Sequence, residues 1–161
     1  MDFAMDLNPG GVGFYDPDLS EFHANGGKII AYHGRSDQTI TSALASEYFT
    51  NIQAALDLSV DEMLSFYRLF LIPGHTHCRG GVGAWNVGQG FPLDDQTLDV
   101  EHNALLALVE WVEEGRKPDE LVGTKYTDDD VTKPVLTQRS KLICLSIGFV
   151  LTFPSTLPVS V

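Results

Sequence analysis

Positive charge is scarce in this sequence. Ten lysine and arginine residues stand against 22 aspartate and glutamate residues, which gives a net charge of −12 at pH 7. The basic residues are scattered along the chain rather than gathered into a stripe. A strongly acidic protein repels the phosphate backbone of DNA and RNA. We therefore expect no nucleic-acid partner.

The first residues of the chain lead us to expect no export signal there. Its first ten residues, MDFAMDLNPG, contain two aspartates and lack the basic and apolar regions that such a signal needs. A long uncharged stretch occurs at the other end, in residues 142–161, where Pro154 and Pro158 interrupt it. The uninterrupted part is short for a membrane span, so we expect no membrane partner and favour a buried strand or misplaced coding sequence over a tail anchor.

Only two cysteines are present, and their number alone decides little. Cys78 and Cys144 could bond to each other, stay reduced or pair with cysteines of another chain. Phosphate-binding glycine motifs are absent as well. The segments GGVGFYD (10–16) and GGVGAWN (80–86) lack the GxGxxG and GxxxxGK[ST] spacings that direct backbone N–H groups at phosphate. We interpret these glycines as turn residues.

What the sequence does contain is the composition of a single folded domain. A length of 161 residues, a hydrophobic content of 43% and a mean hydropathy near zero suit one packed core. Residues 27–34 and 66–72 are short apolar runs bounded by glycine or proline, which indicates two buried strands. Between them, an apolar residue recurs at every fourth position, which predicts a helix over residues 42–56 with a cap at Thr41 or Ser42. Its apolar face would consist of Leu44, Tyr48, Ile52 and Leu56.

Strand, helix and strand together form a βαβ unit, which joins parallel strands through a right-handed crossover. A second helix is predicted over residues 100–114, with Gly115 as its C′ residue and Pro118 shortly after. The apolar side of this second helix would carry Ala104, Leu105, Leu108, Trp111 and Val112. From Tyr126 the pattern dissolves into TDDDVTKP (127–134), so no helix or strand is predicted over that segment.

Two polar side chains follow the predicted strands at their carboxyl ends. Asp37 comes shortly after the first strand, and His77 lies in the segment PGHTHCRGGVG (73–83) that follows the second. Functional groups gather at this edge of a parallel sheet, so the Asp37 carboxylate should lie within hydrogen-bonding distance of His77 Nδ1. In hydrolase triads an imidazole is the general base and a carboxylate orients it. The order of the two residues, acid before histidine, fits the order found in α/β-hydrolases.

The same segment admits other interpretations. His75, His77 and Cys78 are residue types that bind zinc, but ligands so close together rarely converge on one tetrahedral centre. His33 and His102 would have to be recruited to such a site, which we keep as a lesser alternative. In addition, an aspartate after a strand is often a helix cap, and a histidine beside glycine is often a solvated loop residue.

Three blocks of sequence occur in a specific order: His33-Gly34-x-x-Asp37-x-x-Ile40, then FYRLFLIPGHTHCRGGVG (66–83), then VEWVEEGRKPDE (109–120). Together they resemble the C-terminal part of the tannase and feruloyl esterase family over about residues 16–139. The resemblance implies an α/β fold, the C-terminal part of an α/β-hydrolase, with parallel strands, flanking helices and an incomplete sheet. Residues 1–139 would form this portion of a catalytic domain, and residues 140–161 an atypical apolar tail.

The resemblance also implies roles for individual residues. His77 and Cys78 match the end of the family's CS-D-HC motif, so Asp37 would be the acid and His77 the base, whereas His75 falls on a variable position. Cys78 would pair with a cysteine just before the catalytic serine. That cysteine is absent from this chain, so the resemblance implies an unpaired Cys78 thiol here. Ser146 lacks the first glycine of GxSxG and follows the histidine, so we interpret it as an ordinary serine in an apolar strand.

We therefore predict a carboxylic ester hydrolase that cleaves esters of aromatic acids, hydroxycinnamic or gallic, by a Ser-His-Asp mechanism. The family's serine elbow and the calcium site of its lid lie upstream of the matching region, so the chain is expected to be an inactive fragment without a cofactor. The resemblance implies an extracellular location and an aromatic acid ester as the substrate of the complete enzyme. The alternative is a non-catalytic fragment that acts as an interaction module or self-associates through an exposed sheet edge.

Overall fold

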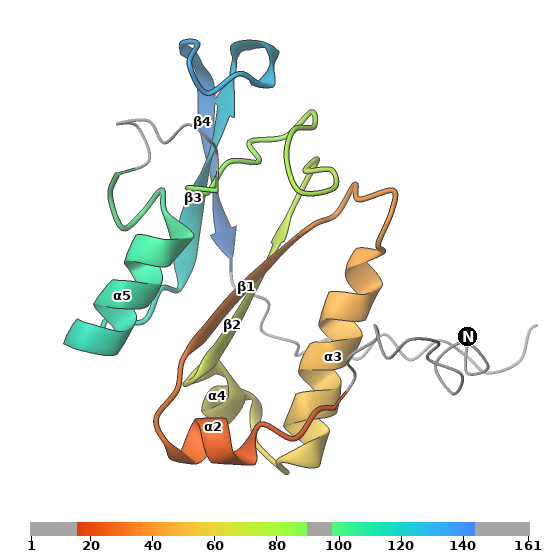
Figure 1. Cartoon of the computed structure of the whole chain (residues 1–161), viewed down its shortest axis with the longest axis vertical. Helices are drawn as coiled ribbons and strands as arrows, with labels where there is room; N and C mark the ends of the chain where they lie inside the picture. Colours follow the sequence, from red (N-terminus) through yellow and green to blue (C-terminus); the bar gives the residue numbers. More distant parts are fainter. Residues whose placement is uncertain (1–15, 90–97, 144–161) are drawn as a thin grey trace, which may run out of the picture.

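The structure is a computed structural model that describes residues 16–89 and 98–143 (Figure 1). Along the chain its elements are α2 (Ser20–Ala24), β1 (Ile29–Gly34), α3 (Ser42–Ala55), α4 (Val60–Leu64), β2 (Tyr67–Ile72), α5 (Ala104–Glu114), β3 (Glu120–Tyr126), η3 (Thr127–Asp129) and β4 (Val135–Ile143). No helix within the two described ranges is long and apolar enough to cross a membrane. Cys144, Ser146 and most of the apolar tail lie outside the described residues.

The strands β1 and β2 form a parallel pair with α3 on the crossover between them. Their register runs over the full length of both strands, beginning with Ile29 opposite Tyr67. The helix α3 begins as predicted, because the Thr41 side chain accepts a hydrogen bond from the N–H of Ala43 at 3.3 Å. The predicted βαβ unit is therefore confirmed.

The buried face of α3 is centred on Phe49 and Ile52, which are 1% and 0% exposed. The recurrence of an apolar residue at every fourth position predicts Ile52 on this face but omits Phe49, the larger of the two residues. The polar segment after α3 contains the short helix α4, which the sequence pattern does not predict. A capping box begins α4: Ser59 Oγ accepts from the N–H of Glu62, and the Glu62 carboxylate accepts from the N–H of Ser59.

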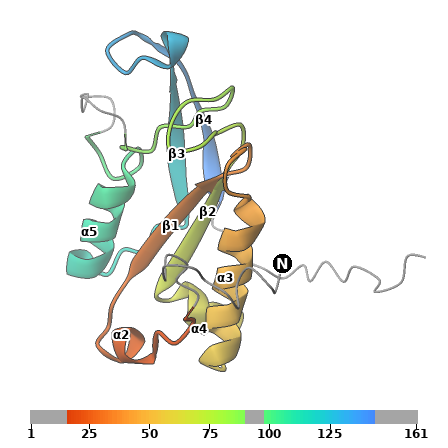
Figure 2. The ribbon, with the colours of Figure 1, turned by 45° about the vertical axis from the view of Figure 1, so that its right-hand side comes forward.

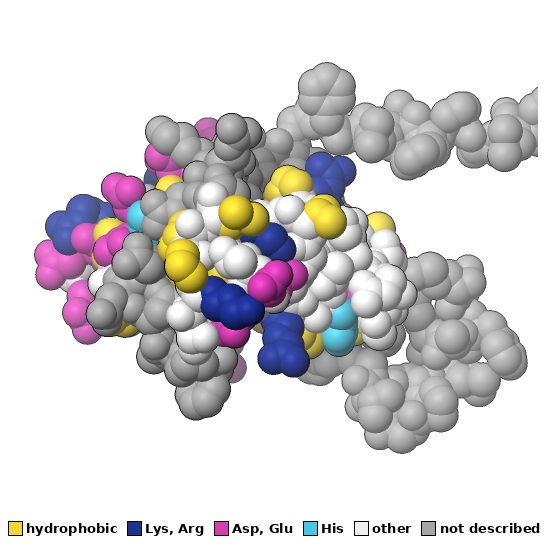
Figure 3. Space-filling view, turned by 90° about the horizontal axis from the view of Figure 1, so that it is seen from above, with side chains coloured by type: hydrophobic (Ala, Val, Ile, Leu, Met, Phe, Trp, Pro, Cys, Tyr) yellow, Lys and Arg dark blue, Asp and Glu magenta, His cyan; other side chains and the backbone are white. Residues whose placement is uncertain are grey.

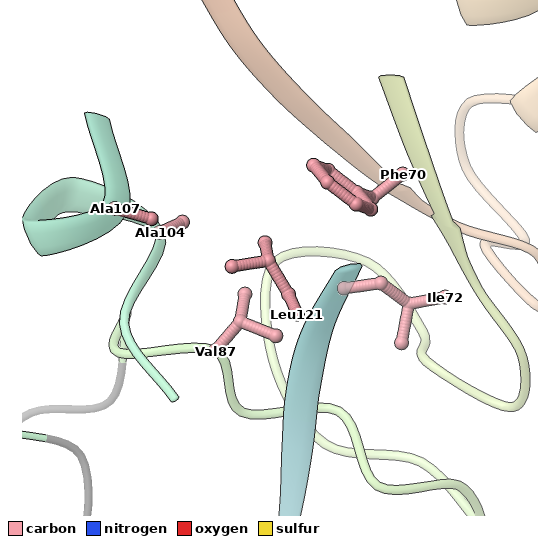
Figure 4. Packing of buried hydrophobic residues seen from close by; sticks show 6 residues of the cluster. All are labelled: Phe70, Ile72, Val87, Ala104, Ala107 and Leu121. Carbon is pink, nitrogen blue, oxygen red and sulfur yellow. The ribbon is translucent and has the colours of Figure 1, made fainter. Parts of the chain in front are cut away.

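Helices cover both faces of the β1–β2 pair (Figure 2). Successive side chains of a strand point to opposite faces. Accordingly, Leu69 of β2 packs in a buried cluster with α3 and α4, whereas Phe70 packs in a second cluster towards α5 and β3. The second cluster consists of Phe70, Ile72, Val87, Ala104, Ala107 and Leu121 (Figure 4). Burial on both faces fixes the two strands, and with them the start of the loops that follow.

The helix α5 begins at Ala104, four residues later than predicted. Asn103 caps it, because the side-chain oxygen of Asn103 accepts hydrogen bonds from two N–H groups of the first turn at 3.0 and 3.2 Å. The predicted apolar side is wrong in part, since Leu105 and Val112 are 68% and 62% exposed. The buried side consists of Ala104, Ala107 and Trp111. The predicted end is confirmed, because Gly115 terminates the helix with a left-handed φ of 71°.

The sequence pattern does not predict the antiparallel pair of β3 and β4. The sequence of β3, ELVGTKY, does not alternate polar and apolar residues, which is the pattern that identifies a half-buried strand. Its buried residues include the polar Thr124 as well as Leu121 and Tyr126. The segment TDDDVTKP forms the turn between the two strands. The sequence-based boundary between residues 139 and 140 falls within β4 and stays a prediction.

Candidate active site

Two loops meet at the carboxyl ends of β1 and β2: the acid loop (residues 35–41) and the histidine loop (residues 73–83). The N–H of Ser36 donates to the carbonyl oxygen of His75 at 3.0 Å, which ties the two loops together. A Cβ atom at Gly34 would lie only 2.4 Å from that same oxygen. A glycine at the end of β1 therefore permits the close approach of the two loops.

Asp37 of the acid loop pairs with His77 of the histidine loop. The Asp37 Oδ2 atom accepts a hydrogen bond from His77 Nδ1 at 2.9 Å, so the predicted contact is confirmed. The other carboxylate oxygen accepts the backbone N–H groups of Thr39 and Ile40 at 2.8 and 2.9 Å. The Asp37 side chain is 6% exposed and that of His77 is 38% exposed. A carboxylate only accepts hydrogen bonds, so the proton of a neutral His77 ring lies on Nδ1, and Nε2 is left as an acceptor.

Hydrogen bonds to the carboxylate keep Asp37 ionised. The N–H of Ile40 contributes most to lowering the pKa of Asp37 to about 2; burial opposes the shift, and His77 and Thr39 add to it. At neutral pH Asp37 is therefore a carboxylate, and it lies beside a histidine ring that it orients. Such a pair is able to accept a proton at Nε2, because the carboxylate stabilises the imidazolium that forms.

His33 is a neighbour of the pair that the sequence analysis did not place there. Its Nε2 atom lies 2.9 Å from the carbonyl oxygen of Ile40 and 3.5 Å from Asp37 Oδ2. The sequence hints at this contact only through the four-residue spacing between His33 and Asp37. Whether two residues at that spacing come together depends on how the chain turns after β1. The contact between His33 and the Ile40 carbonyl therefore holds the acid loop beside the carboxylate.

His75, the other histidine of the segment, is part of the loop's internal structure. Its side chain is buried, its Nδ1 atom lies 3.2 Å from the carbonyl oxygen of Gly80, and its ring stacks on Trp85 at a centroid distance of 6.0 Å. Burial lowers the pKa of His75, so this ring is neutral at pH 7. Of the two histidines, the structure pairs only His77 with Asp37 within the described residues.

The zinc alternative has no support in the part of the chain that the structure describes. His75 is directed at Gly80 and Trp85, whereas His77 is directed at Asp37. Across residues 16–89 and 98–143, no group of three or more His, Cys, Asp or Glu residues is placed to hold a metal ion. The described residues therefore do not form this zinc site.

Cys78 lies at the surface directly after His77, with a left-handed φ of 64°. It has no disulfide partner among the described residues, and Cys144 lies beyond them. A pocket of about 380 Å³ is lined by Asp37 and His77 together with Tyr32 and Cys78. A larger hollow of about 630 Å³ also borders Cys78 but includes neither member of the pair. We therefore take the smaller pocket as the candidate active site.

The parallel strands with helices on both faces, and the imidazole and carboxylate at their carboxyl ends, define a partial α/β-hydrolase fold. More particularly, the chain belongs to the tannase and feruloyl esterase family, whose profile matches residues 12–145. The family resemblance drawn from the sequence is thereby confirmed. A protein named "Probable feruloyl esterase B-2" from Aspergillus flavus is 40% identical over 139 residues, which cover 85% of this chain and 27% of that protein.

Solved structures show the same relationship. The chain is similar to an esterase from Aspergillus oryzae and to feruloyl esterase B from the same organism, with TM-scores of 0.78 and 0.77 and 34% sequence identity to each. Both matches cover 89% of this chain and 28% of the solved chain. The chain thus spans roughly a quarter of the length of the relatives it matches.

Proposed function

We propose that this chain supplies the acid and the base of a carboxylic ester hydrolase whose nucleophilic serine lies outside these 161 residues. The observation that carries the proposal is the 2.9 Å hydrogen bond between Asp37 Oδ2 and His77 Nδ1, in a pair that lines a pocket. Membership of the tannase and feruloyl esterase family supports an ester as the substrate.

In the proposed reaction, His77 Nε2 takes the proton of the serine hydroxyl while the serine oxygen attacks the ester carbonyl carbon. The ionised Asp37 stabilises the imidazolium. His77 then gives its proton to the leaving alkoxide as the ester C–O bond breaks, which leaves an acyl-serine. In the second half, His77 takes a proton from water, the hydroxide adds to the acyl carbon, and the serine regains a proton as the carboxylic acid leaves.

We propose esters of aromatic acids, of the hydroxycinnamic or gallic type, as the substrates. The relatives named feruloyl esterases support this class. Tyr32 and Ile40 add aromatic and apolar surface to the pocket beside His77, and a planar aromatic acid suits such a lining. The family resemblance also leads us to propose an extracellular location. The test is to measure how much of the protein is in the culture medium and how much stays in the cells.

The test of the proposed reaction compares two chains. The 161-residue chain should not measurably hydrolyse methyl ferulate or methyl gallate, because loss of a triad serine costs about a millionfold in turnover. The longest reading frame that contains these residues together with an upstream serine elbow should be active. His77→Ala should abolish that activity, whereas the matched control His102→Ala should not, because His102 pairs with Asp99 and does not line the pocket.

Two results would contradict this assignment. Activity of the longer chain that survives His77→Ala would rule out His77 as the base. Hydrolysis by the 161-residue chain that His77→Ala abolishes would place the nucleophile within these residues and refute its proposed absence.

A second candidate function is self-association through the free edge of β1. Within the described residues β1 pairs only with β2, and a two-stranded sheet is marginally stable by itself. An unpaired strand edge is a template for another strand. Sedimentation velocity tests this alternative: a concentration-dependent dimer that Tyr32→Lys on β1 removes would support it, and a monomer at every concentration would refute it.

A further inference from the structure

The turn between β3 and β4 contacts the histidine loop and its neighbour Trp85 through one carboxylate. Asp129 Oδ1 accepts a hydrogen bond from Trp85 Nε1 at 2.6 Å, and Asp129 Oδ2 lies 3.4 Å from the backbone nitrogen of Gly81. The ammonium group of Lys125 bonds to both Asp129 Oδ1 and the carbonyl oxygen of Gly81. Figure 3 looks onto this end of the molecule and shows acidic and basic side chains side by side.

Trp85 connects this carboxylate to the interior of the histidine loop. Its side chain is buried, and its ring stacks on that of His75 with an interplanar angle of 17°. The Nδ1 atom of His75 lies 3.2 Å from the carbonyl oxygen of Gly80, which also accepts the N–H of Thr76 at 3.1 Å. His77 follows Thr76 directly in the chain. The contacts thus run from Asp129 to the residue beside the proposed base.

The backbone of the histidine loop is packed against itself at distances that only glycine tolerates. A Cβ atom at Gly81 would lie 2.0 Å from the carbonyl oxygen of Gly74, and one at Gly83 would lie 2.0 Å from that of Pro73. Rotation of a side chain cannot absorb a shift of this backbone. A displacement at Gly81 therefore passes to the rest of the loop, including His77.

Asp129 is itself held in place by the turn. Asp128 and Asp129 have left-handed φ angles of 55° and 58°, which residues other than glycine seldom adopt. The turn is closed by a hydrogen bond from the N–H of Asp130 to the carbonyl oxygen of Thr127 at 3.1 Å. Burial acts to raise the pKa of Asp129, but the hydrogen bonds from Lys125 and Trp85 outweigh it and lower that pKa, so the group is an anion at neutral pH.

We propose that Asp129 is a positioning residue, which fixes the histidine loop through Trp85 and Gly81 so that His77 Nδ1 meets the Asp37 carboxylate. Asp129 does not line the pocket of the pair, so it acts through these residues and not on a substrate. The inference rests on the proposed function, because that reaction requires an oriented His77.

NMR of the ring N–H groups in the 161-residue chain tests the positioning without any substrate. The Nδ1–H of His77 should give a protected signal, because Asp37 accepts its hydrogen bond. Asp129→Asn keeps the size of the side chain but removes its charge, and should speed exchange of that signal about tenfold, as loss of one charge-assisted hydrogen bond implies. Trp85→Phe keeps a ring against His75, removes the donor to Asp129 and should have the same effect.

Asp128→Asn is the matched control, because Asp128 lies in the same turn but pairs with Lys133 at 2.8 Å. In this variant the exchange rate of the His77 Nδ1–H signal should not change. Circular dichroism verifies that each variant is folded. The two test variants alter opposite ends of one hydrogen bond, so either of them decides the question if the other fails to fold. Unchanged exchange at His77 in a folded Asp129→Asn or Trp85→Phe chain would overturn the proposal.

Turnover separates this inference from the proposed function. In the longer, active chain, Asp129→Asn should lower kcat about tenfold and leave KM unchanged, since the loss concerns the orientation of the base and not the binding of the ester. Faster exchange at His77 with an unchanged kcat would support the positioning contact and refute His77 as the base. Unchanged exchange and kcat, in a chain that His77→Ala inactivates, would refute the positioning role alone.

Discussion

Replacing Gly34 by alanine places a methyl group against the backbone of the histidine loop. The new Cβ atom would lie 2.4 Å from the carbonyl oxygen of His75, whereas real Cβ contacts are essentially never shorter than 3.0 Å, so the end of β1 and the histidine loop must separate by at least about 0.6 Å. The obstacle is backbone and cannot rotate away. Overpacking of this kind costs about 1–3 kcal/mol of unfolding free energy.

The same displacement should weaken the contact between Asp37 and His77. Their nitrogen–oxygen distance of 2.9 Å would rise towards about 3.5 Å, at the limit of a hydrogen bond. Thermal unfolding followed by circular dichroism should show a Tm lowered by about 3–15 °C, and the protected Nδ1–H signal of His77 should be lost. Misplacement of the base by this amount should also reduce kcat of the longer chain by up to about a hundredfold.

Gly26→Ala is the matched control. Gly26 has a φ of 75° and nothing within 4 Å of an added Cβ atom, so alanine there strains the backbone without touching the site. That variant should lose stability and keep the His77 signal. The reasoning would be refuted by a Gly34→Ala chain whose Tm stays within about 1 °C of the original and whose His77 signal is unchanged.

Three further predictions concern stability. Leu69→Ala should cost about 2–5 kcal/mol in urea unfolding, because Leu69 is fully buried, whereas Leu105→Ala at an exposed position should change it by less than about 0.5 kcal/mol. Asn103→Ala should cost about 0.5–2 kcal/mol through loss of the α5 cap, and an unchanged urea midpoint would contradict the capping role. The pKa of Asp37 is lowered to about 2 in the folded state, so its carboxylate stabilises the fold above a pH of about 4, and this contribution disappears as the pH falls towards 2. The Tm difference between the original chain and Asp37→Asn should therefore shrink over that pH range. A Tm difference that stays constant would contradict this prediction.

The parts of the fold that the sequence predicts are those set by short-range pattern. The apolar runs at β1 and β2 and the spacing along α3 suffice for the βαβ unit, and parallel strands necessarily bring Asp37 and His77 to the same edge. By contrast, β3 is buried along residues of mixed polarity and carries no alternating pattern. The start of α5 depends on the choice of Asn103 as the cap, which periodicity alone does not determine.

The surroundings of the pair depend on contacts between distant residues, which no local pattern encodes. Asp129 and Trp85 are hydrogen-bonded although 44 residues separate them in the sequence. Asp129 also has a left-handed backbone conformation, which the local sequence does not predict. The role of His75 is similar, because two histidines with one residue between them look equivalent until Trp85 covers one of them. The family resemblance distinguishes them in the sequence, and the contacts of the two rings distinguish them physically.

The kcat of Asp37→Asn in the longer chain tests the central claim, that Asp37 and His77 are the acid and base of ester hydrolysis. The substituted asparagine would keep the shape of the side chain but could neither hold the ring by a charged acceptor nor stabilise the imidazolium. Asp99→Asn is the matched control, because Asp99 pairs with His102 at 2.8 Å and does not line the pocket. With methyl ferulate as substrate, Asp37→Asn should lower kcat about ten-thousandfold while Asp99→Asn leaves it nearly unchanged; an Asp37→Asn enzyme that keeps more than about a tenth of the original kcat would contradict the account.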